Sequence, residues 1–195
     1  VLSANVVERL KPKARAAFLN FVRAPESSRA WAAAERIMDW LRKSGVKALY
    51  IDDPDFPERL RQINDCPTLI YHKGDINLLN KDAISIVGTR KPTAFGQAFA
   101  AQIAAELTEA GLVVISGMAT GIDSAAHAGA LKCTGKTIAV WATGLDYVYP
   151  HSAKKLAGDI LQRGAVISEM PPGTAPHRGL FPCLLYTSPS PRDLA

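Results

Sequence analysis

Residues 83–150 read AISIVGTRKPTAFGQAFAAQIAAELTEAGLVVISGMATGIDSAAHAGALKCTGKTIAVWATGLDYVYP. Apolar runs begin near residues 83, 112 and 136, so they recur at about the 30-residue length of a βαβ unit. The runs do not alternate with polar residues, which is typical of parallel strands buried on both faces. This stretch therefore predicts an α/β fold, a Rossmann-like parallel sheet with helices on both faces.

The segments around this stretch complete the expected domain. Residues 165–168 (AVIS) predict a fourth strand of the core, and residues 68–71 (TLIY) predict an extra strand that joins the same sheet. Residues 72–75 are expected to form a turn. In the first helix of the core, four large apolar residues recur every four positions and predict one buried stripe. They are Phe95, Phe99, Ile103 and Leu107.

The N-terminal segment differs from the core in composition. Residues 1–45 are rich in helix formers and contain two amphipathic segments, the clearer of which begins after Ser27–Ser28 and ends near Gly45. We expect a small helical domain at residues 1–45, of the SAM or helix-hairpin-helix type, and a core domain at residues 46–182.

Composition limits the function only loosely. A net charge of +5 and a pI near 9.2 permit an anionic partner without requiring one. No apolar run approaches the length of a membrane span, and the cysteines and histidines lack the spacing of metal ligands. We expect a protein of the cytoplasm that has no metal site, no cofactor and no contact with membranes.

Three loops follow the predicted strands, and the carboxyl ends of parallel strands meet at one edge of a sheet, where ligands bind. Glycines let backbone amides approach a ligand closely, and helix N-termini favour anions. Arg90 and Lys91 add two cations. The sequence thus predicts a phosphate-binding rim, for either a nucleotide or a polynucleotide. Its candidate residues are Gly88, Thr89, Arg90, Lys91, Ser116, Gly117, Gly121 and Gly144.

Several features argue against nucleotide-cofactor chemistry. The first loop is GTRKPTAFG and not GxGxxG, and no acidic residue ends the second strand to bind a ribose. Asp123 and His127 lie one helical turn apart, but no nucleophile accompanies them by spacing, so a capping aspartate and a structural histidine are favoured over a catalytic pair. Tyr147 and Tyr149 are equally compatible with base stacking and with packing.

The C-terminal end is excluded from the functional argument. Residues 183–193 (CLLYTSPSPRD) resemble the conceptual translation of a transposase adapter used in sequencing libraries. We therefore expect residues 183–195 not to be native and the natural sequence to extend beyond both ends of this one.

Together, the motifs resemble the DNA processing protein A (DprA/Smf) family. The resemblance rests on IVGTRKPTAFG (86–96), SGMATGIDSAAHAGAL (116–131), TIAVWATGLDYVYP (137–150) and ISEMPPGTAP (167–176), with FP at 181–182. It implies a non-catalytic protein that binds single-stranded DNA, helps load the RecA recombinase during natural transformation, and forms a homodimer when intact. It also implies DNA-binding roles for Arg90 and for Arg178, just ahead of the FP motif. The family's arginine-rich segment after FP is missing here, so part of the DNA pocket is expected to be absent.

Two alternatives remain open on sequence. The first is a Rossmann-type enzyme acting on nucleotides, similar to phosphoribohydrolases, in which Glu169 would be the candidate acid or base; no PGGxGT-type motif accompanies it. The second is a protein-interaction module in which the rim is vestigial and binds no ligand.

Overall fold

The computed structural model describes residues 11–63, 65–133, 135–177 and 180. The chain consists of two compact units, Val1–Ser44 and Gly45–Ala195. Arg178 and residues 183–195 lie outside the described residues, so the predictions about them stay predictions.

The N-terminal unit contains the two expected helices. They are α2 (Pro12–Arg23) and α3 (Arg29–Ser44), joined by the short 3-10 helix η1 (Pro25–Ser27). Ser28 starts α3, because its Oγ accepts a hydrogen bond from the backbone N–H of Trp31 at 3.0 Å. Both helices lie wholly within the described residues, and neither holds a buried side chain.

The second unit is built on a six-stranded sheet of order β1-β2-β6-β5-β4-β3. Strands β3 to β6 are mutually parallel, as predicted. The strands are β1 (Lys47–Tyr50), β2 (Leu69–Gly74), β3 (Ala83–Ser85), β4 (Val113–Ser116), β5 (Thr137–Trp141) and β6 (Ala165–Ser168).

The sheet is mixed because its other two strands are antiparallel. The predicted extra strand is β2, which pairs antiparallel with β6. Strand β1 was not predicted and pairs antiparallel with β2. The turn expected at residues 72–75 is wrong over His72–Gly74, because these residues continue β2 alongside residues 165–167. Pairing with β6 supplies backbone hydrogen bonds that local turn propensity does not anticipate.

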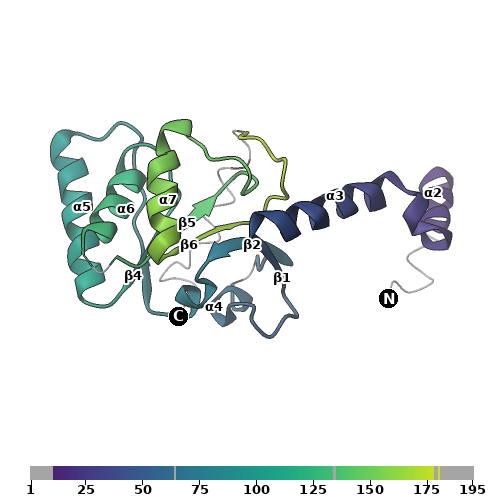
Figure 1. The fold of residues 1–195 in the computed structure, drawn as a ribbon, viewed down its shortest axis with the longest axis horizontal. Helices are drawn as coiled ribbons and strands as arrows, with labels where there is room; N and C mark the ends of the chain where they lie inside the picture. The colour runs from purple at the N-terminus through teal and green to yellow at the C-terminus, as the bar shows by residue number, and fades with distance from the viewer. Residues whose placement is uncertain (1–10, 64, 134, 178–179, 181–195) are drawn as a thin grey trace. The chain divides into compact units, whose positions relative to one another are not determined.

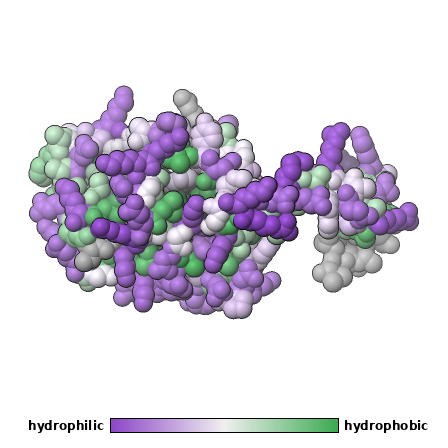
Figure 2. All heavy atoms as spheres, in the orientation of Figure 1, coloured by the Kyte–Doolittle hydropathy of each residue, from purple (hydrophilic) through white to green (hydrophobic). Residues whose placement is uncertain are grey.

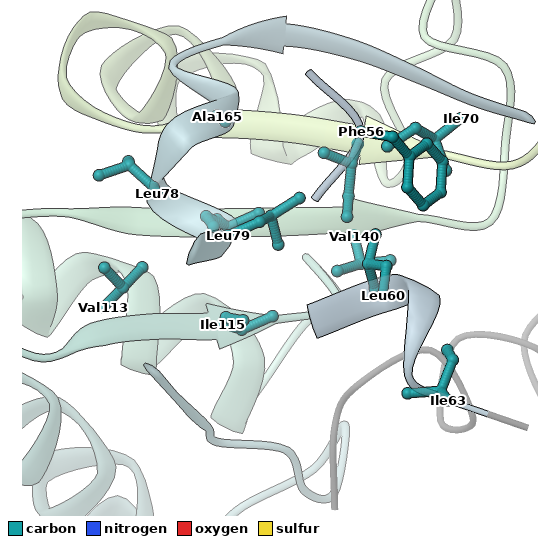
Figure 3. Close-up of a cluster of buried hydrophobic side chains, with 12 residues drawn as sticks. Phe56, Leu60, Ile63, Ile70, Leu78, Leu79, Val113, Ile115, Val140 and Ala165 are labelled. Atoms are coloured by element: carbon teal, nitrogen blue, oxygen red, sulfur yellow. The ribbon is translucent and has the colours of Figure 1, made fainter. Parts of the chain in front are cut away.

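Side chains along the parallel strands alternate between two cores. Val113, Ile115, Val140 and Ile167 face one core, which is completed by the segment from α4 (Glu58–Arg61) to η2 (Ile76–Asn80) (Figure 3). Val114, Ala139, Trp141 and Val166 face the opposite side, towards α5 (Ala94–Glu109), α6 (Ile122–Lys132) and α7 (Lys154–Arg163). These three helices lie side by side (Figure 1). The strands are thus covered on both faces, as their unbroken apolar runs predicted.

The predicted buried stripe of α5 is wrong for its two aromatic residues. Phe95 is 78% exposed and Phe99 is 51% exposed, whereas Ala100, Ala104 and Thr108 are buried. The reason is the close approach of α5 to α6, where Gly129 lies against the backbone of Ala101. Helices this close bury small residues, which leaves the large ones on the outer face.

No helix among the described residues is long and apolar enough to span a membrane.

The contact between α5 and α6 yields a stability prediction. A Cβ added to Gly129 would collide with the backbone of Ala101, and overpacking costs about 1–3 kcal/mol. We expect Gly129→Ala to lower the free energy of unfolding by about 2 kcal/mol in urea titrations. Gly158→Ala in α7 is the matched control, since its added Cβ would meet no described atom within 4 Å apart from its chain neighbours and the backbone of its own helix, and helix propensity favours alanine by about 0.5–1 kcal/mol. Equal effects of the two changes would contradict the assignment.

Candidate nucleic-acid interface

The first and second loops of the core are joined by their backbones. Gly121 has φ = +93°, and a Cβ there would collide with the backbone of Thr89 and Arg90. The next residue, Ile122, donates its N–H to the carbonyl oxygen of Thr89 at 3.2 Å. Only glycine combines this backbone conformation with such a close approach. Gly121 therefore holds the loop that carries Arg90 and Lys91 against the start of α6.

A buried carboxylate lies beneath this junction. Asp123, in the first turn of α6, accepts a hydrogen bond from the N–H of Gly88 at 3.3 Å. The backbone amides of Gly117 and Ala119 bond to the same carboxylate. The carboxylate of Asp123 thus places a negative charge of the protein itself on the inner side of both glycine loops. The amides of Gly88 and Gly117, which the sequence assigned to a bound phosphate, are occupied by Asp123.

The surroundings of Asp123 have opposite effects on the pKa of its carboxyl group. Burial raises the pKa of the carboxyl group above its usual range, and this is the largest effect. The amides of Gly88, Ala119 and Gly117 and the guanidinium of Arg90 act in the opposite direction. The positive charge of Arg90 therefore compensates part of the cost of the buried carboxylate.

The third loop is held by the segment after β6. The N–H of Gly144 donates to the carbonyl oxygen of Thr174 at 3.0 Å, and a Cβ on Gly144 would strike Pro171 and Pro172. Asp146 accepts the N–H of Gly173 with both carboxylate oxygens, at 2.9 and 2.8 Å. The loop is thereby fixed with Tyr147 and Tyr149 about half exposed.

The three loops meet around one hollow of about 70 Å³. It combines a guanidinium, a turn of small residues and an aromatic side chain. Its lining residues are Arg90, Gly117, Ala119, Thr120, Tyr149 and Pro150.

The predicted site residues divide into two groups. Thr89, Arg90 and Lys91 are exposed and Gly117 and Gly121 are partly exposed at the rim. Ser116 and Gly144 are buried: the Ser116 hydroxyl donates to the carbonyl oxygen of Ile86 at 2.6 Å. These two residues position the loops, and their predicted contact with a ligand stays a prediction.

Sequence reasoning did not assign three of the lining residues to the site, Ala119, Thr120 and Pro150. The first two lie between the glycines of the GMATG turn, and none of the three has a charged side chain that would mark it.

Comparison with known proteins identifies the family. The model of the family described as DNA recombination-mediator protein A matches residues 47–183, more than half of the chain. The chain belongs to this family. The resemblance to the DprA/Smf family stated from the motifs is thus confirmed.

Individual relatives agree with the family model. DNA processing protein DprA of Bacillus subtilis (strain 168) is 37% identical over 148 residues, which cover 75% of this chain and 50% of the relative. DprA of Streptococcus pneumoniae (strain ATCC BAA-255 / R6) is 41% identical over 130 residues, covering 67% of this chain and 46% of the relative. The chain therefore spans about half the length of these relatives.

Solved structures of the family share the fold. The X-ray structure of DprA from Streptococcus pneumoniae matches with a TM-score of 0.68 at 38% identity, over 72% of this chain and 50% of that one. DNA processing protein A from Helicobacter pylori matches with a TM-score of 0.64 at 30% identity, over 73% of this chain and 66% of that one. The Helicobacter structure concerns that protein's single-stranded DNA binding mode.

His127 has the structural role favoured by the sequence. It is fully buried, and its Nδ1 lies 2.7 Å from Oγ1 of Thr137. Thr137 donates its only hydroxyl hydrogen to the carbonyl oxygen of Val114 at 2.7 Å, so Nδ1 of His127 is the donor to Thr137. Burial lowers its pKa to about 4, with a smaller opposing effect from the backbone of Ser116. The imidazole ties α6 to β5 within this family member.

Glu169 lies apart from the Arg90 hollow. It is partly buried, and burial raises the pKa of its carboxyl group. It lines a cavity of about 20 Å³ with Trp141, Ile167 and other largely apolar residues. Among the described residues, this cavity and the Arg90 hollow share no lining residue. Since one water needs roughly 10–15 Å³, the enclosed part of this cavity has room for about one water molecule.

Within residues 11–63, 65–133, 135–177 and 180, no three side chains of the metal-ligating types come together.

The role of Asp123 leads to a stability prediction. We expect Asp123→Ala to lower the free energy of unfolding by about 2–3 kcal/mol at pH 7, because three amides lose a charged acceptor. Asp123→Asn keeps one acceptor oxygen and should cost less. Urea unfolding measures both changes. A loss of equal size in the two variants would show that the carboxylate does not hold the loops through these amides.

The burial of His127 leads to a titration prediction. Because its folded pKa is depressed from 6.5 to about 4, its contribution to stability is complete above pH 6.5. That contribution is lost as pH falls towards 4, by about 3 kcal/mol in all. His72 acts in the same direction and Asp123 in the opposite one, so a residue-specific measurement is needed. We expect the imidazole NMR signal of His127 to titrate with a midpoint near pH 4; a midpoint near 6.5 would contradict its buried, neutral state.

Proposed function

We propose that this chain binds single-stranded DNA, with the sugar–phosphate backbone lying along the rim that Arg90 and Lys91 share with the Gly117–Gly121 turn. The observation that carries the proposal is the Arg90 hollow. It places a guanidinium beside small residues that allow a phosphate to come close, and beside the half-exposed ring of Tyr149. Cations that follow a backbone, combined with aromatic rings, are the usual elements of single-strand binding.

The electrostatics of the rim support a phosphate ligand. Asp123 already satisfies the inward amides of the loops, so the attraction for an external anion rests on the outward cations and not on the glycine amides. Arg90 balances Asp123 only in part, because Asp123 is buried and Arg90 is exposed. Lys91, also exposed, adds a second positive charge, and its N–H bonds to Oγ1 of Thr89 at 3.2 Å. The Helicobacter relative, described for single-stranded DNA binding, supports the same ligand.

We infer that the binding is not accompanied by catalysis. The family is a recombination-mediator family. The two residues that a nucleotide-processing enzyme would use are placed unfavourably: His127 is sealed in the core, and Glu169 lies in a separate small cavity.

The finer parts of the proposal concern the intact protein. We propose that it works in the cytoplasm during DNA uptake, presents the bound strand to a RecA-type recombinase, and acts as a homodimer. Arg178, outside the described residues, is proposed as a second DNA-binding cation on the strength of its place before the FP motif.

Salt-dependent binding tests the proposal. We expect the chain to bind a fluorescent deoxythymidine 30-mer with an affinity that falls steeply with salt, because phosphate contacts release counterions. Arg90→Ala should weaken binding roughly tenfold and reduce the slope of log K against log salt by about one. Fluorescence anisotropy between 50 and 300 mM salt measures both quantities.

Lys136→Ala is the matched control, because it removes one exposed positive charge just before β5. This position is at the amino ends of the parallel strands, whereas the rim is at their carboxyl ends. It should change affinity and slope little. Equal effects of the two substitutions would point to net charge alone, and failure of the chain to bind at low salt would refute the proposed function.

A further inference from the structure

An exposed aromatic pair lies on the outer face of α5. Phe95 and Phe99, one helical turn apart, are 78% and 51% exposed. Their rings stack, with centroids 5.8 Å apart and planes inclined by 14°. Figure 2 shows hydrophobic surface where the upper end of α5 lies in Figure 1. Single exposed apolar residues are common on proteins, but two stacked rings at neighbouring positions form a small exposed aromatic surface.

The pair is close to the proposed DNA-binding rim. Helix α5 starts directly after the loop that carries Arg90 and Lys91, with Thr93 as its N-cap: Oγ1 of Thr93 accepts the N–H of Gly96 at 3.1 Å. Phe95 is five positions after Arg90 in the sequence, so their Cα atoms are at most about 18 Å apart. A strand that contacts Arg90 needs only a short continuation to reach the rings.

The surroundings of the pair suit a polyanion that carries flat apolar groups. No Asp or Glu occurs between Asp82 and Glu106, so nothing acidic in this stretch repels a phosphate. The other exposed residues on this half of the helix are Ala94, Gln97 and Ala98. These small or polar side chains do not extend the two rings into a broad apolar patch of the kind that marks many protein–protein contacts. Stacking of a base on an aromatic ring needs only the ring face.

We infer that Phe95 and Phe99 form a stacking platform for a nucleobase of a single strand whose phosphates lie at Arg90 and Lys91. The inference rests on the proposed function and adds a base-contacting site to it. Because every base has a π face, the platform increases affinity without selecting a sequence.

Two probes separate base contacts from phosphate contacts. One is a fluorescent deoxythymidine 30-mer, and the other is an abasic 30-mer with the same phosphates and no bases. We expect the double variant Phe95→Ala/Phe99→Ala to bind the thymidine probe at least fivefold more weakly, with an unchanged salt slope. Its affinity for the abasic probe should equal that of the unsubstituted chain.

Controls distinguish stacking from general effects. Tyr50→Ala removes a 59% exposed aromatic from β1, at the opposite edge of the sheet from β3, and should leave both affinities unchanged. The single variant Phe95→Trp keeps Phe99 and an aromatic ring at position 95, so it should bind the thymidine probe as the unsubstituted chain does. The fluorescence of the introduced tryptophan should be quenched by the thymidine probe but not by the abasic one. Thermal unfolding of the double variant should match that of the unsubstituted chain, because both rings are exposed.

Each other outcome overturns the inference. Unchanged thymidine binding by the double variant removes the platform and leaves the proposed function in place. Equal loss on both probes assigns the rings to the shape of the phosphate site. A change in sedimentation without a change in DNA affinity assigns them to contact with another protein copy. Failure of the unsubstituted chain to bind either probe removes the proposed function and the platform together.

Discussion

The backbone contact between the first two loops of the core is the constraint on which the site depends. Gly121 meets the backbone of Thr89 and Arg90, and Asp123 takes up amide hydrogens from both loops. Neither loop has regular secondary structure to hold it. The carboxylate and the glycine together give the loops a fixed position relative to α6, and this position brings Arg90 to the rim.

This arrangement separates two tasks that glycine-rich loops often combine. In many phosphate sites the amides of the loop bind the ligand directly. Here an internal carboxylate occupies them, and in the proposed function the exposed cations attract the external anion. Such a surface suits a long, repetitive ligand, because cations and ring faces along a groove tolerate movement of a strand. The family assignment agrees with that chemistry.

The fold was largely predictable, because it follows from local patterns. Unbroken apolar runs at regular intervals indicated the parallel strands, and their alternate side chains do enter two opposite cores. The aromatic stripe of α5 was misread for the same local reason. The spacing of its large apolar residues is helical, but spacing alone does not say which face of α5 packs against α6. Gly129 permits so close an approach of α6 that alanines are buried and Phe95 and Phe99 are left outside.

The sequence by itself determined the class of fold, the family and the loops that carry the site, because these depend on periodicity and on short motifs whose residues are contiguous. Only the tertiary structure decided which atoms of those loops remain available. Ser116 and Gly144 are used in packing, Asp123 holds the inward amides, and Tyr149 completes the hollow around Arg90. These outcomes depend on distances between segments remote in sequence, and no local pattern specifies such distances.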